Sequence, residues 1–86
     1  MPEISRFYGI VIRLYFADHN PPHFHAEYSG HEARIDISTL AVISGRLPGR
    51  ALGLVAEWAT LHQDELLDLW NRAASLEPLH KIEPLS

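Results

Sequence analysis

The sequence predicts an α+β fold, with a three- to four-stranded antiparallel sheet followed by a long C-terminal amphipathic helix packed on one face. Short segments rich in β-branched and aromatic residues occupy residues 6–45, and turn-forming residues separate them. Apolar residues then recur at helical spacing over residues 47–75. With 86 residues the chain is long enough for a single domain over 1–86, in which residues 76–86 form a tail.

The first predicted strand covers residues 8–16, and Pro21 and Pro22 follow the turn residues that end it. Its face directed to the core would hold Ile10, Ile12, Leu14 and Phe16. The remaining strands are expected at residues 23–28, 31–37 and 40–44, with a tight hairpin at Ser29-Gly30 and a break at Gly45.

The helical segment begins near Pro48, because proline suits the first turn of a helix. Its apolar stripe continues to about residue 74, with a bend expected near residues 62–64, where a second helix could start. Trp58 and Trp70 both fall on this stripe, so we expect both rings in the core.

The formal net charge is −4, and residues 51–86 carry all of it, since five basic and five acidic residues balance over 1–50. The first half therefore offers a neutral-to-positive face. The chain has no cysteine, which excludes a disulfide framework and limits any metal site to His, Asp and Glu. With no signal-peptide pattern and no apolar run long enough to span a bilayer, we expect a cytoplasmic protein without membrane contact.

Residues 19–25, His-Asn-Pro-Pro-His-Phe-His, are the best lead to chemistry. His23 and His25 are two apart on a predicted strand and so share a face, and His19 can fold back across the two prolines. Three such imidazoles can hold zinc or another divalent ion. The additional ligands considered are Asp18, Glu27 and His31.

The same histidines also suit acid–base cleavage of RNA without a metal, which needs a base, an acid and cations for the phosphate. In that hypothesis His19, His23, His25 and Arg46 are catalytic, and Arg13, Arg34 and Arg50 bind phosphate. A structural alternative makes the two prolines a rigid turn or a docking surface for another protein. Arg46 and Arg50 at the helix start either attract an anion or pair with Glu32 or Asp36.

Five segments of the chain resemble a family of small bacterial proteins, the domain-of-unknown-function family numbered 4160. They are residues 2–10, 18–28, 45–48, 50–52 and 82–85, so the resemblance covers essentially the whole chain. It implies a partner, a small protein encoded by the neighbouring gene, in a two-gene toxin–antitoxin-like module with this chain as the toxin-like component. Relatives carry a second basic residue where this chain has Gly49, which implies a weaker basic patch here.

These observations together predict a toxin-like component that acts on RNA and is ribonuclease-like if it is an enzyme. The alternatives are a non-catalytic protein-binding subunit and a metal-binding domain built on the histidine segment. A chain this short also gains stability from association, so a homo-oligomer is a further expectation.

Overall fold

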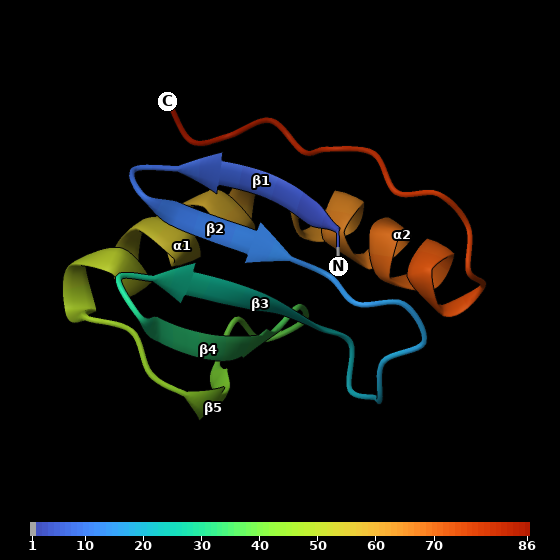
Figure 1. The fold of residues 1–86 in the computed structure, drawn as a ribbon, viewed down its shortest axis with the longest axis horizontal. Helices are drawn as coiled ribbons and strands as arrows, with labels where there is room; N and C mark the ends of the chain where they lie inside the picture. Colours follow the sequence, from blue (N-terminus) through green and yellow to red (C-terminus); the bar gives the residue numbers. More distant parts are fainter. Residues whose placement is uncertain (1) are drawn as a thin grey trace.

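The computed structural model describes residues 2–86, which form one antiparallel sheet with two helices on one of its faces (Figure 1). The elements are β1 (Glu3–Phe7), β2 (Ile10–Arg13), β3 (His23–Tyr28), β4 (His31–Asp36), β5 (Val42–Gly45), α1 (Gly49–Leu61) and α2 (Gln63–Ala74). The strands lie in the sheet in the order of the sequence, β1 to β5. The α+β class is therefore confirmed, with five strands and two helices in place of the predicted three or four strands and one helix.

The additional strand, β1, precedes the segment over residues 8–16 that the sequence predicts as the first strand. Tyr8 and Gly9 have φ angles of 51° and 80°, and this pair of positive φ values turns the chain back so that β1 pairs with β2. Tyrosine favours strands, so its presence in the left-handed region hid the turn. The strand predicted over residues 8–16 is therefore present but shorter, since Tyr8 and Gly9 form the turn and β2 covers Ile10–Arg13.

The β3–β4 hairpin follows the prediction closely, with Ser29 and Gly30 forming the turn at positive φ. Its register pairs Glu27 with Glu32 and His25 with Arg34. β5 pairs with the other side of β4 and forms one edge of the sheet.

Two helices replace the single predicted helix because the backbone leaves the helical region at His62, with φ −130° and ψ 21°. The expected bend is thus a complete break. Gln63 begins the second helix, and its side-chain amide donates hydrogen bonds to the carbonyl oxygens of Ile37 and Ser38. The break lets α1 and α2 cover different parts of the sheet (Figure 1).

The core lies between the sheet and the helices and centres on Trp58, which is fully buried against Phe7 and Phe24. Trp70 is also buried, so both tryptophans lie where the apolar stripe predicts. None of the helices within residues 2–86 is both long enough and apolar enough to cross a membrane.

The tail after α2 runs beside β1 as an ordered segment without helix or strand (Figure 1). Ile82 is buried, and its backbone N–H donates a hydrogen bond of 2.7 Å to the carbonyl oxygen of Ile4. The indole N–H of Trp58 donates to the carbonyl oxygen of Glu83. These bonds fasten the tail to the core.

Candidate functional site

The candidate site lies at the start of β3, where alternate residues point to opposite faces of the sheet. Phe24 points toward Trp58 in the core, whereas His23 and His25 share the other face, as the sequence predicts. Both histidines are only 4% exposed. The ring of His23 packs against Trp70 and that of His25 against Tyr15, at centroid distances of 5.2 and 4.3 Å.

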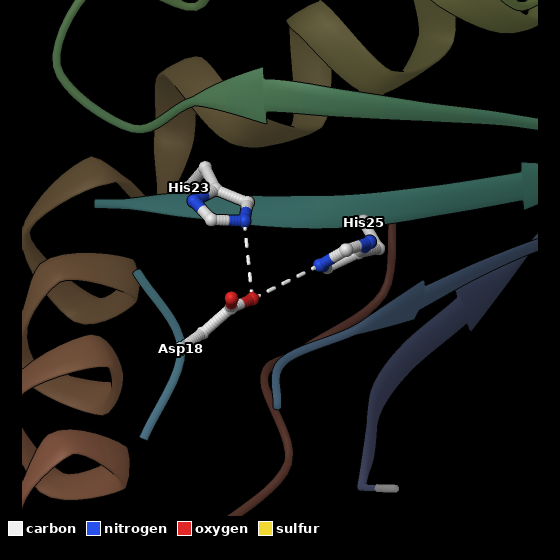
Figure 2. A group of neighbouring side chains, drawn as sticks. All are labelled: Asp18, His23 and His25. Carbon is white, nitrogen blue, oxygen red and sulfur yellow. Dashed lines mark hydrogen bonds and ion pairs between the residues drawn. The ribbon is translucent and has the colours of Figure 1, made fainter. Parts of the chain in front are cut away.

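Asp18 brings the two histidines to a common point, as Figure 2 shows. Its Oδ2 atom lies 3.1 Å from Nε2 of His23 and 3.3 Å from Nε2 of His25. One ligand atom from each of the three residues lies within 4.8 Å of the other two. Two imidazoles and one carboxylate converging in this way are a donor set for Zn²⁺ or Fe²⁺.

The second nitrogen of each ring also faces an oxygen. Nδ1–H of His23 donates a 2.7 Å hydrogen bond to the carbonyl oxygen of Pro21. Nδ1 of His25 lies 3.4 Å from Oε2 of Glu32, a contact too long and too poorly aligned for a strong hydrogen bond. Histidine ligands commonly hold such an outer acceptor at one nitrogen while the other binds metal.

Asp18 is held in place by its neighbours in the loop between β2 and β3. Its Oδ1 atom accepts the backbone N–H of His19 at 2.8 Å. Ala17 has φ 54°, an uncommon value for alanine, and its N–H donates to the carbonyl oxygen of Ala73 at the end of α2. Burial raises the pKa of Asp18, but the His19 N–H and the two histidine side chains outweigh it and lower that pKa below its usual value.

A depression of about 320 Å³ opens beside the cluster. Its lining residues are Tyr15, Phe16, Ala17, Asp18, His25, Glu32 and Arg34. His25 and Asp18 therefore line the depression, whereas His23 does not. Burial, followed by the charges of Glu32 and Glu27, raises the pKa of the Tyr15 hydroxyl at this position.

His19 does not join the cluster as we expected, because its side chain is exposed on the loop and Asp18 occupies the third position. Of the other ligands considered, Glu27 pairs with Arg13 and His31 lies exposed at the hairpin turn.

The expected phosphate-binding arginines are dispersed. Arg34 lies at the depression, whereas Arg13 forms an ion pair with Glu27 at 3.1 Å. Arg50 lines a different pocket beside the first turn of α1. Arg46 is exposed after β5 and is not on the lining of the depression. Neither Arg46 nor Arg50 pairs with Glu32 or Asp36, although the backbone N–H of Arg46 donates to the carbonyl oxygen of Glu32.

Two features of the site were not predicted, the positions of Glu32 and Phe16. The position of Glu32 could have been derived from the hairpin register, because a two-residue turn at Ser29-Gly30 places it on the same face of the sheet as His25. Phe16 was predicted to face the core but is 43% exposed at the depression. β2 ends at Arg13, so the strand alternation no longer sets the direction of Phe16. The sequence around Arg13 contains no signal that β2 ends there.

The comparison with protein families gives one match, to the family described as "Domain of unknown function (DUF4160)", over residues 9–71. The matched region contains β2 to β5, α1 and most of α2, and therefore the whole candidate site. No curated protein and no solved structure matches the chain. Because the family model covers more than half of the sequence, the chain belongs to the DUF4160 family.

Proposed function

We propose that this protein binds one divalent metal ion, zinc in the first place, through Asp18, His23 and His25 and uses it for hydrolysis. The observation that carries the proposal is that both nitrogens of each histidine face oxygens. His23 lies between the Pro21 carbonyl and Asp18, and His25 lies between Glu32 and Asp18.

A neutral imidazole has one N–H and one lone pair, so it can satisfy only one of two oxygens. The other oxygen then faces the lone pair, which is unfavourable for a buried group. Protonating both rings would satisfy the oxygens but would place two cations in buried rings whose centroids are 5.1 Å apart. A single metal ion held by the two Nε2 atoms and Asp18 would avoid both the oxygen facing a lone pair and the two buried cations.

The geometry at His23 also favours a metal over a proton, whereas Nε2 of His25 meets the criteria for a hydrogen bond to Asp18. Nε2 of His23 is 3.1 Å from Asp18, yet no hydrogen bond of acceptable alignment reaches it from residues 2–86. A hydrogen bond needs its proton near the line between the two atoms, and this pair does not meet that requirement. Bonds of about 2.0–2.1 Å from zinc to these atoms are compatible with the separations of 3.1 and 3.3 Å between Asp18 and the two histidines.

Three protein ligands leave a coordination position for water, which is typical of catalytic rather than structural zinc sites. Asp18 and His25 line the depression, so a substrate bound there would lie next to an ion held by these residues. An ion held by these residues would lower the pKa of a coordinated water to about 7 and supply a nucleophile for hydrolysis.

Acid–base cleavage by two histidines without metal is less well supported. That mechanism requires both rings to reach the substrate. His23 is buried, its Nδ1–H is occupied by Pro21, and it does not line the depression. We propose that the hydrolytic activity serves the toxin-like role expected from the family resemblance, with RNA as target.

Metal content tests the proposal directly. The full chain is stripped with a chelator, titrated with Zn²⁺ by calorimetry, and measured by elemental analysis. We expect one ion per chain and a rise in melting temperature, since a ligand that binds only the folded state stabilises it. H23A, H25A and D18A should each weaken zinc binding at least 100-fold.

H19A and H31A are the matched controls, because both histidines are exposed and lie outside the cluster. Both should bind zinc like the parent chain. H25Q and D18N supplement the alanine variants, and circular dichroism shows whether each variant folds. Absence of stoichiometric binding by the parent chain, or unchanged binding by folded variants of the three ligands, would overturn the proposal. In cells, the double variant H23A/H25A should lose any toxicity that induction of the parent causes.

The second candidate function, a protein-binding subunit, is favoured by one observation. β5 has a strand neighbour on one side only, and its Val42 and Ile43 are exposed. We propose that an extended segment of the protein encoded by the neighbouring gene adds to this edge, since open edges recruit further strands. The two proteins should co-purify, and I43K should abolish this without altering zinc binding. If the two proteins still co-purify with the I43K and V42K variants, the edge of β5 is excluded as the binding surface.

A further inference from the structure

The depression beside the metal-ligand cluster has an aromatic ring on its rim. Phe16 is one of the few large apolar residues with substantial exposure, and it follows Tyr15, whose ring packs on His25. The next residue, Ala17, is hydrogen-bonded to Ala73, and Asp18 is held by the cluster. The loop therefore presents the Phe16 ring from a fixed position rather than from a loose end.

A cation lines the same depression from β4. Arg34 lies opposite His25 in the register of β3 and β4. Its side chain is exposed and forms no ion pair with any of residues 2–86. Arg6, Arg13 and Arg72, in contrast, each hold a carboxylate. A guanidinium without a carboxylate partner is well suited to bind a phosphate.

The charge of the depression depends on the metal. Asp18 and Glu32 contribute −2 and Arg34 contributes +1, so the lining carries −1 when its histidine is neutral. A divalent ion changes this to +1, because −1 and +2 sum to +1. An anionic substrate is therefore attracted only when the site is loaded.

We propose that the depression binds single-stranded nucleic acid, with Phe16 stacking on one base and Arg34 binding a phosphate beside the metal site. This inference rests on the proposed function and adds to it the single-stranded form of the substrate and the residues that bind it. Stacking on an aromatic side chain and a cationic contact to the backbone are the two interactions by which proteins hold single strands. A duplex offers no unstacked base to Phe16.

The reaction implied is hydrolysis of a phosphodiester. The oxygen of water forms a bond to phosphorus, and the bond from phosphorus to one sugar oxygen breaks. One proton of the water goes to solvent and the other to the released sugar hydroxyl, so atoms and charge balance.

The test measures binding of fluorescein-labelled oligo-U and oligo-dT, each about twelve nucleotides long, to the zinc-loaded full chain by anisotropy. We expect F16A to weaken binding about five- to 100-fold, and F16W to restore it. R34A should weaken binding and reduce the slope of log affinity against log salt by about 0.7. Removing zinc with a chelator should weaken binding of the parent chain.

L61A and R6A are the matched controls, since both residues are exposed and lie outside the depression, and Arg6 already holds Glu3. Both should bind the oligonucleotides like the parent chain. Zinc titration of F16A and R34A separates the two proposals: if the parent fails to bind zinc, the proposed function fails. If zinc binds but F16A and R34A bind the strands like the parent, only this inference fails. Equal binding of a duplex also overturns it. Binding of RNA alone, DNA alone or both supports it and identifies the sugar.

Discussion

The carboxylate of Glu32 lies 3.4 Å from Nδ1 of His25, whereas Nε2 of the same ring bonds to Asp18 at 3.3 Å. In the proposed metal site, a proton on Nδ1 of His25 would face Glu32 and leave the Nε2 lone pair for the ion. The Pro21 carbonyl acts on His23 in the same way. Each of the two proposed ligands therefore has an oxygen near its outer nitrogen, one from a side chain and one from the backbone.

Replacing Glu32 with glutamine should weaken zinc binding about tenfold, because outer partners of histidine ligands contribute about 10–100-fold to metal affinity. Competition against a chromogenic chelator measures the effect. E27Q is the control, since Glu27 lies on the same face of the sheet as Glu32 but accepts a hydrogen bond from Arg13. An equal loss in both variants would show that only the local charge matters.

The lowered pKa of Asp18 makes part of the stability of the zinc-free chain dependent on pH. A carboxyl whose pKa is lower in the folded state stabilises the fold above its unfolded pKa, here 3.8, and this stability is lost as pH falls through the lowered folded value. We expect D18N to be less stable than the parent by about 1 kcal/mol at neutral pH. Urea unfolding at several pH values should show the difference shrinking below the unfolded pKa. A constant difference would contradict this.

At the scale of elements, the β3–β4 hairpin and the β2–β3 loop together build the site. The hairpin supplies both histidines, Glu32 and Arg34, and its register could be predicted from the Ser29-Gly30 turn. The loop supplies Asp18, and its path could not be predicted. It depends on the positive φ of Ala17 and on a bond to Ala73, which lies more than fifty residues away in the sequence.

Gly45 in β5 should be essential for the geometry around Glu32. Its φ is +76°, and a Cβ atom there would overlap the backbone oxygen of Glu32. Gly30 has a similar φ of +83° but open space around it. G30A should therefore cost about 1–2 kcal/mol, the penalty for the left-handed conformation alone. G45A should cost clearly more in urea unfolding and should also weaken zinc binding. Equal losses of stability in G30A and G45A would show that the backbone around Glu32 adjusts to the added Cβ atom at no extra cost.

For the whole molecule, composition and periodicity were sufficient to predict the α+β class, the order of sheet and helices, and burial of both tryptophans. The first hairpin was not predictable, because Tyr8 is a strand-forming residue placed in a turn. The packing of the tail on β1 was not predictable either, since it depends on contacts between the two ends of the chain.

The tail should contribute to global stability, because Ile82 is 2% exposed within the core. I82A should lower the free energy of unfolding by about 2–5 kcal/mol, the usual cost of truncating a buried isoleucine. L61A, which truncates a residue that is 69% exposed, should change it by less than about 0.5 kcal/mol. Thermal and urea unfolding measure both. A loss for I82A as small as that for L61A would show that the tail is not part of the core.

The bond from the Ala17 amide to the Ala73 carbonyl joins the loop that carries Asp18 to the last turn of α2. Helix ends fray more readily than helix centres, and fraying here would release the loop from the imidazoles. The residence time of a bound ion would then follow the opening rate of a helix end rather than the exchange rate of the ligands themselves.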